Sequence, residues 1–281
     1  MDAAVRAELD AAGRTDDEDL DIGAVALALA TAAQPGTARA PYERHLAQIA
    51  DAVGAYVGGR RGPAPLALRH EALVQVIHKR FGYVGTEDAF DDIEAASLMR
   101  VIDRRGGLPV ALGILYLHAA RRAGWAAAGV DFPGRFLLSL DPETKADGAR
   151  LIFDPFEGGR VMQAHDLREM LKRMAGPDAE LDPEHYRAAG PRAVLLRLQN
   201  NIKVRHLDAR RPGAALSVLE TMVALAPRDA TLWREVGILH ARLDQIPAAV
   251  AALEECLRHD AYDQARYRTS ALLQELRGRL V

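Results

Sequence analysis

The chain has 281 residues, of which 49% are hydrophobic and 27% charged, and its formal net charge is -3. This length accommodates one large domain or two ordinary ones, and the composition is that of a soluble globular protein. The small net charge excludes a general electrostatic attraction to nucleic acid or to an anionic membrane. Cys256 is the only cysteine, which excludes an intramolecular disulfide and fits a reducing cytoplasm.

The first hundred residues predict helices. The apolar run 22–33 is shorter than the roughly 20 residues of a membrane span, so it indicates a buried helix. The acidic cluster at 16–21 suits the start of that helix, and a partner-binding acidic arm is the alternative. Met1 is followed by Asp2 rather than by basic residues, so we expect no targeting signal. Apolar spacing predicts further helices at 42–57, before a turn-rich break at 58–63, and at 68–81 and 91–105.

A helix that is apolar on almost every side is predicted from Pro109 to Ala123, and Gly106, Gly107 and Leu108 precede it. Such a helix is buried. Strands are expected at 126–132, 136–140 and 151–153. The turn-rich link 141–148 predicts that the last two pair antiparallel. The result is an α+β region that ends near residue 180.

The last ninety residues carry an internal repeat of 34 residues, the length of a tetratricopeptide repeat. Its helices are expected at 192–208, 212–226, 229–243 and 246–259, with a capping helix at 262–280. The first copy is degenerate, because Gln199 and Lys203 stand at the places of the usual Trp and Gly. His206 and His240 are interpreted as packing residues rather than metal ligands. Two repeats bury little surface by themselves, so we expect them to dock on the first domain.

Three motifs resemble the transglutaminase-like SirB family: residues 105–112, 132–136 and 154–158. The resemblance implies an α+β fold, with a mostly helical transglutaminase-like (papain-like) core and a small antiparallel sheet at 1–180. A linker at 181–191 and an all-α tetratricopeptide repeat domain at 192–281 would follow. The resemblance also implies a bacterial cytosolic protein of poorly defined role, and it carries over no activity.

The three places that hold Cys, His and Asp in the related enzymes are occupied here by Pro109, Arg135 and Asp154. Pro109 has no nucleophilic atom and suits a first helical turn, and Arg135 stays charged and cannot act as a base. A charge-assisted hydrogen bond between Arg135 and Asp154, both aimed at the start of the Pro109 helix, would preserve the architecture without acyl transfer. We therefore expect a pseudoenzyme with no cofactor and no metal.

The repeat positions that usually face the groove predict a surface for a protein partner. Basic and amide groups flank apolar ones there, which favours an acidic peptide over nucleic acid or membrane. The predicted binding residues are Arg197, Asn200, Val204, Arg234, Ile238 and Arg242. The alternative is that this surface packs on the first domain. The competing function is a residual, cysteine-independent hydrolase or transferase; Cys256 occupies a small buried repeat position far along the chain. The sequence does not indicate an oligomeric state.

Overall fold

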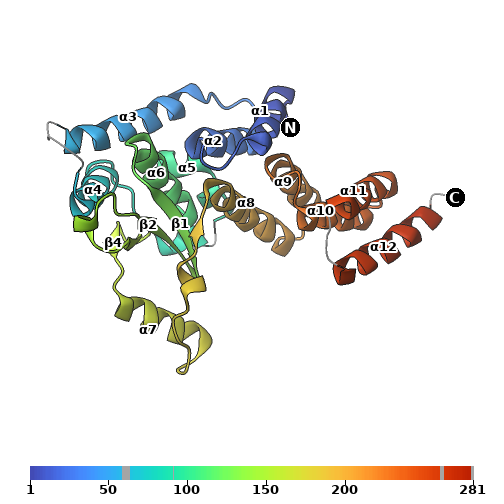
Figure 1. The fold of residues 1–281 in the computed structure, drawn as a ribbon. Helices are drawn as coiled ribbons and strands as arrows, with labels where there is room; N and C mark the ends of the chain where they lie inside the picture. Colours follow the sequence, from blue (N-terminus) through green and yellow to red (C-terminus); the bar gives the residue numbers. More distant parts are fainter. Residues whose placement is uncertain (59–63, 91, 260–262, 280–281) are drawn as a thin grey trace. The chain divides into compact units, whose positions relative to one another are not determined.

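The computed structural model describes residues 1–58, 64–90, 92–259 and 263–279. They pack into two compact units. We call Asp16–Leu198 the core unit, and Met1–Thr15 together with Gln199–Val281 the repeat unit (Figure 1). All but the first residue of the predicted break at 58–63 lies outside the described residues.

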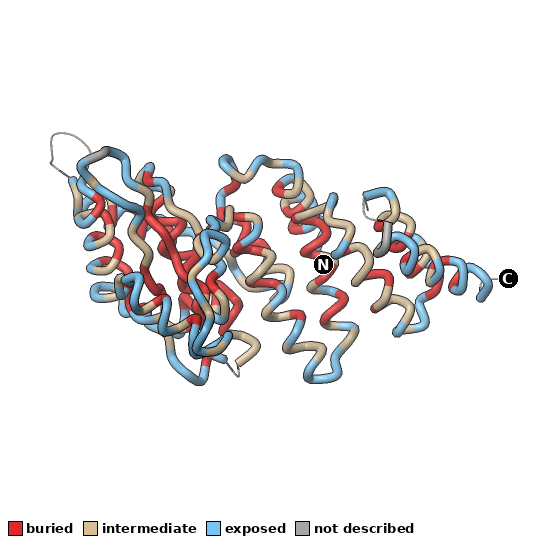
Figure 2. Tube along the Cα trace, turned by 60° about the horizontal axis from the view of Figure 1, so that its bottom comes forward, coloured by how far each residue is buried: buried red, intermediate tan, exposed pale blue. Residues whose placement is uncertain are grey.

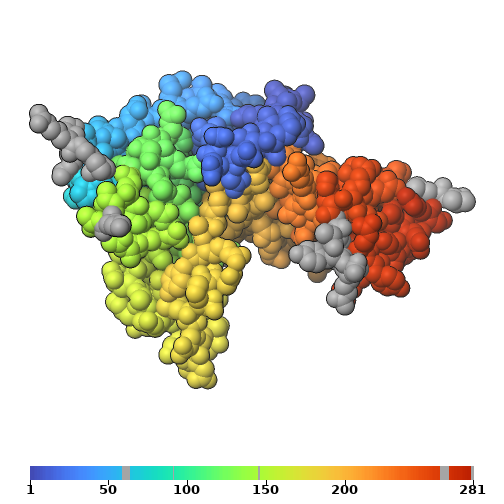
Figure 3. Space-filling model, viewed as in Figure 1, coloured from blue at the N-terminus to red at the C-terminus, as the bar shows by residue number. Residues whose placement is uncertain are grey.

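Several helices of the core unit pack on one central helix, α6 (Pro109–Arg122), whose residues from Pro109 to Ala120 are buried as predicted. Figure 2 shows that buried residues gather in the interior of this unit. The other helical elements of this unit are α2 (Ile22–Ala33), α3 (Ala40–Val57), α4 (Leu66–Leu73) with a π-helical continuation η1 (Val74–Arg80), η2 (Glu87–Phe90), η3 (Ile93–Ala96), α5 (Leu98–Arg104), η4 (Lys145–Asp147), α7 (Ala164–Ala175), η5 (Pro183–Tyr186) and the first part of α8 (Pro191–Asp208). In the space-filling view, α7 and the segment after it form the lower lobe of this unit (Figure 3).

The prediction of a single helix at 91–105 is wrong, because the described part of this stretch forms η3 and α5 instead. Asp92 caps η3 by accepting a hydrogen bond from the Glu94 backbone N–H. Ser97 then takes an extended conformation, with φ -80° and ψ 120°, which interrupts the helical path. Residue 91 lies outside the described residues.

The sheet of the core unit is antiparallel, with the strand order β4-β3-β2-β1-β5. Its strands are β1 (Ala127–Phe132), β2 (Arg135–Leu140), β3 (Leu151–Asp154), β4 (Arg160–Val161) and β5 (Ala188–Ala189). The predicted antiparallel pairing of β2 with β3 is confirmed. β5 and η5 lie in the segment expected to be a linker, and β5 pairs with β1.

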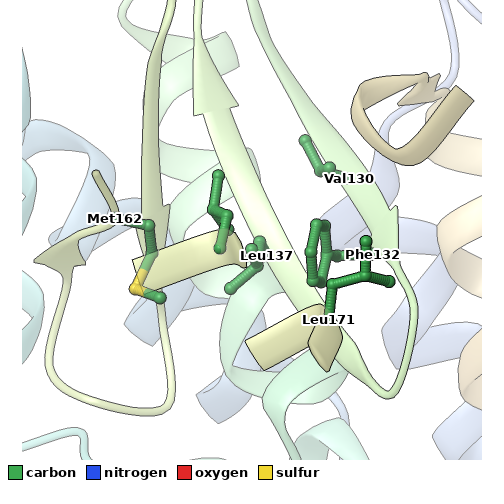
Figure 4. Close-up of a cluster of buried hydrophobic side chains, with 6 residues drawn as sticks. Val130, Phe132, Leu137, Met162 and Leu171 are labelled. Carbon is green, nitrogen blue, oxygen red and sulfur yellow. The ribbon is translucent and has the colours of Figure 1, made fainter. Parts of the chain in front are cut away.

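The two faces of the sheet are covered by different helices. On one face α6 packs so closely that a Cβ at Gly113 would lie 2.5 Å from the Phe136 ring and 3.4 Å from Leu138. On the other face Val130, Phe132 and Leu137 form a buried cluster with Met162 and with Leu167 and Leu171 of α7 (Figure 4). Alternation along the strands therefore decides which helix each strand residue meets.

The repeat unit contains the end of α8, then α9 (Pro212–Leu225), α10 (Ala230–Arg242), α11 (Ile246–His259) and α12 (Asp263–Gly278). These helices confirm the predicted repeat pattern. The degenerate positions are explained by polar contacts: buried Thr221 donates to the Gln199 side chain at 3.3 Å, and Lys203 pairs with Glu235 of α10.

The first helix, α1 (Ala3–Arg14), also belongs to the repeat unit. The sequence-based division places these residues in the first domain. In the structure α1 packs on α9, with Val5, Leu9 and Ala12 buried. A Cβ at Gly13 would lie 2.2 Å from the carbonyl oxygen of Ala224, so the end of α1 touches the α9 backbone.

Candidate functional site

The predicted pair of Arg135 and Asp154 is present in the structure. Arg135 opens β2 and Asp154 closes β3, the neighbouring strand. Arg135 Nε donates to Asp154 Oδ2 at 2.7 Å, and Arg135 Nη2 donates to Glu157 Oε1 at 2.8 Å. The guanidinium also lies 5.3 Å from the centre of the Phe156 ring. Glu157 was missed as a partner, although the Asp154–Gly158 motif contains it.

Asp154 is held as a buried carboxylate with both oxygens engaged. Its side chain is 0% exposed, while that of Arg135 is 24% exposed. Its Oδ1 accepts the backbone N–H of Phe156 at 2.8 Å. Burial raises the pKa of Asp154, and the nearby Arg135 charge and hydrogen bond oppose this shift. The arrangement suits ion pairing better than proton transfer, because an arginine stays charged near neutral pH.

Pro109 takes no part in this ion pair. It is the first residue of α6, where a missing N–H costs no helical hydrogen bond. Arg135 is the cross-strand partner of Phe132, so its Cβ points to the sheet face covered by α7 rather than α6. The residues before α6 and after β3 are bridged by the segment 83–85. Val84 N–H donates to the Arg105 carbonyl at 3.2 Å, and Gly85 N–H donates to the Phe156 carbonyl at 3.0 Å.

Tyr116 of α6 packs against β3, with its ring centre 5.7 Å from that of Phe153. The Tyr116 hydroxyl is buried and has no hydrogen-bond partner among the described residues. Burial, and secondarily the Asp154 charge, raises the pKa of Tyr116, so this phenol stays protonated at neutral pH.

The one thiol of the sequence is buried. Cys256 is 1% exposed within α11. Within the described ranges, no group of three or more His, Cys, Asp or Glu side chains is placed to hold a metal ion. None of the described helices is long and apolar enough to cross a membrane.

The predicted binding residues do not all share one surface. Arg197 lies in the core unit, where it pairs with Asp131 and its guanidinium sits 5.4 Å from the centre of the Phe136 ring. Burial lowers the pKa of Arg197. Arg197 therefore fits the alternative in which the predicted binding surface packs on the first domain, because its side chain covers the sheet.

The other five predicted residues belong to the repeat unit. Asn200 and Val204 are exposed on α8, and Arg242 is exposed at the end of α10. Arg234 and Ile238 are half-buried on α10. Neither Arg234 nor Arg242 forms an ion pair with any described residue, and the Arg234 Nε atom is buried without a hydrogen-bond partner there.

The fold and the site define a class of protein in which a transglutaminase-like core is followed by tetratricopeptide repeats. Residues 40–200 match the transglutaminase-like superfamily, and residues 202–274 match a tetratricopeptide repeat family. The chain therefore belongs to the transglutaminase-like superfamily, which confirms the fold class expected from the sequence.

Bacterial relatives extend this assignment. The chain is 29% identical to a UPF0162 protein of Xylella fastidiosa over 194 residues, which is 68% of each chain. It is 31% identical to a UPF0162 protein of Pseudomonas aeruginosa, over 76% of this chain and 75% of the relative. It is 26% identical to protein SirB1 of Salmonella typhimurium, over 62% of this chain and 63% of the relative. The resemblance to the SirB family is thus confirmed.

Proposed function

We propose that the chain is a non-catalytic binding or scaffold protein whose repeat unit holds a protein partner through an acidic segment. The proposal rests on one observation: Arg234 and Arg242 lie on the same side of α10, and neither forms an ion pair with any described residue. Ile238 lies between them at helical spacing, so charged and apolar groups alternate along one side of the helix.

The chemistry of the core supports a binding role. The place of the general base holds Arg135, whose guanidinium is committed to Asp154 and Glu157. The place of the nucleophile holds Pro109, so the covalent route has no attacking atom. A transglutaminase-like core of this kind would act as a folded platform for the repeats.

The chemistry of the α10 side favours carboxylates. A guanidinium binds a carboxylate through two parallel hydrogen bonds, which gives both strength and geometric specificity. Val204 of α8 is 42% exposed and would offer an apolar contact to the same partner. A Glu-rich segment with one apolar side chain, or an acidic C-terminus, matches these groups.

The test is a titration of the full chain with a fluorescent, Glu-rich peptide that carries one Leu and a free C-terminus. The double variant Arg234→Glu with Arg242→Glu should weaken binding at least about tenfold, which is about 1.4 kcal/mol. Arg228→Glu is the matched control, because Arg228 is exposed in the turn before α10 and has no ion pair among the described residues. Unchanged affinity in the double variant, or equal binding of a Lys-rich peptide, would contradict the proposal.

A further inference from the structure

A pocket of about 400 Å³ lies in the repeat unit, on a different surface from the unpaired arginines. It is lined by residues of α1, α9, α10 and α11. Val223, Trp233 and Val236 form its apolar floor, and Ala248, Ala251 and Ala252 form one wall. This volume holds a few side chains of a partner, rather than a whole helix.

Helical geometry separates this pocket from the surface proposed above. Each residue of an α-helix turns about 100° from the one before. Trp233, Val236 and His240 therefore share one side of α10, and all three line the pocket. Residues 234, 238 and 242 share the opposite side. A partner at one surface thus leaves the other free.

Trp233 offers the pocket an apolar surface although its side chain carries a polar atom. The Trp233 indole Nε1–H donates to the Pro227 carbonyl at 2.9 Å, so its polar atom is already satisfied. The ring is half-buried and offers its accessible part as an apolar contact. On α11, Ala248, Ala251 and Ala252 lie three and four residues apart, and their small side chains let another helix approach closely.

The repeat unit already binds one helix next to this pocket. α1 comes from the far end of the sequence and packs on α9 through Val5, Leu9 and Ala12. Arg6 of the same helix lines the pocket. An amphipathic helix alongside α1 would therefore extend a packing arrangement that the unit already uses.

The charged side chains at the rim of the pocket indicate which sign of charge a partner should carry. Arg6 is paired with Asp10, Arg258 with Glu255, and Glu254 with Arg277. The Glu220 side chain forms no ion pair or hydrogen bond with any described residue, although it lines the pocket. Among the described side chains of this rim, the charge left without a partner is therefore acidic.

We propose that the pocket formed by α1, α9, α10 and α11 is a docking site for an amphipathic helix of a partner protein. The helix would carry a large apolar side chain for the Trp233 floor and a Lys or Arg toward Glu220. This site is independent of the proposed acidic-peptide surface, so each can fail without the other.

The experiment uses the full chain and a fluorescein-labelled helical peptide with Leu on one face and Lys at its flanks. A scrambled peptide of the same composition and a peptide with Glu in place of Lys are the matched probes. The Leu/Lys peptide should bind at least tenfold more tightly than either. In a Trp125→Phe background, binding should also shift the emission of Trp233, since the chain contains 2 Trp residues.

Substitutions in and away from the pocket test where the peptide binds. Ala251→Glu, at an exposed position of the pocket wall, should weaken binding at least tenfold, whereas Ala271→Glu on the exposed side of α12 should leave it unchanged. Glu220→Lys should reverse the preference toward the Glu peptide. The Arg234→Glu, Arg242→Glu double variant should bind the Leu/Lys peptide normally. Failure of this peptide to bind, equal binding of the scrambled peptide, or an unchanged affinity in Ala251→Glu would overturn the proposal.

Discussion

Arg135 reaches from the start of β2 to Asp154 at the end of β3 and holds its carboxylate at 2.7 Å, with the Asp154 side chain fully buried. The arginine is itself partly exposed and also contacts Glu157. The pair therefore places the charge that balances a buried carboxylate where β2 begins and β3 ends. Breaking such a pair is costly chiefly because the remaining charge stays buried.

Arg135→Ala should destabilise the chain by about 3 kcal/mol, at the low end of the range for buried pairs because Arg135 is partly exposed. Urea unfolding at neutral pH measures this loss. Arg187→Ala is the control, since Arg187 and Glu184 are both exposed, and it should cost at most about 1 kcal/mol. Equal losses in the two variants would contradict the role given to the Arg135 pair.

The stability deficit of Arg135→Ala should shrink as the pH falls. Burial raises the pKa of Asp154 in the folded chain. The stability that follows from this raised pKa is fully present below the unfolded pKa of about 3.9, and it is lost as the pH rises through the folded pKa. Removing Arg135 raises that folded pKa further. The difference between wild type and variant should therefore be larger near pH 7 than near pH 5. A difference that stays constant or grows toward acid would argue against a buried, ionised Asp154.

Asp21 gives the opposite pH dependence. It caps α2, and its contact with His118, 3.6 Å from Nδ1 to Oδ1, is the main reason that the pKa of Asp21 falls to about 2. Stability from this group is present above its unfolded pKa of about 3.9 and is lost as the pH falls through the folded pKa of about 2. Asp21→Asn keeps the cap but loses the charge. It should cost about 1 kcal/mol near neutral pH, a figure reduced for solvent screening because half of the side chain is exposed, and the cost should shrink toward zero as the pH falls below the folded pKa.

The control for Asp21 is Asp2→Asn. Asp2 caps α1 in the same way, accepting from the Ala4 and Val5 backbone N–H groups. Asparagine is as good a cap as aspartate, so this change should be close to neutral at every pH. A cost at Asp2 equal to that at Asp21 would show that capping, rather than His118, carries the effect.

Gly113→Ala tests the close packing of α6 on the sheet. The added Cβ would lie 2.5 Å from the Phe136 ring, so we expect a loss of about 1–3 kcal/mol in unfolding free energy. Gly54→Ala is the same change in α3 with nothing within 4 Å of the new Cβ, and it should stabilise by about 0.5–1 kcal/mol. A neutral Gly113→Ala would mean that α6 and β2 are less tightly packed than this geometry requires.

The repeats should depend on α1. Leu9 is fully buried where α1 packs on α9, so Leu9→Ala should cost about 2–5 kcal/mol, whereas Arg14→Ala at an exposed position of the same helix should cost little. A fragment of residues 192–281 lacks this helix and should self-associate, and a synthetic peptide of residues 1–15 should restore a monomeric, cooperative melt. Such a melt without the peptide would refute this dependence.

The sequence predicts the features that depend on local periodicity and on motif order. The repeat of 34 residues indicates α9, α10 and α11, and the turn-rich link after β2 indicates its antiparallel partner. The Arg135–Asp154 pair follows because the two motifs lie at the ends of adjacent strands.

Features that depend on long-range packing are not predictable in this way. α1 and α9 lie far apart in the sequence, and nothing in the local pattern of residues 3–14 indicates that they meet. Arg197 has the helical spacing of a groove residue, but a favourable ring contact and Asp131 draw it onto the sheet. Strands of two residues, such as β4 and β5, carry too little alternation to be recognised.

We infer that the core keeps a transglutaminase-like fold without the covalent chemistry. Its most direct test is a sensitive assay for amide hydrolysis and acyl transfer on glutamine-containing peptides, run with the full chain and with Asp154→Ala, after circular dichroism shows that both are folded. We predict that neither protein releases ammonia or transfers an acyl group faster than the buffer, because Pro109 supplies no nucleophile and Arg135 no base. Turnover by the full chain that Asp154→Ala abolishes would contradict it.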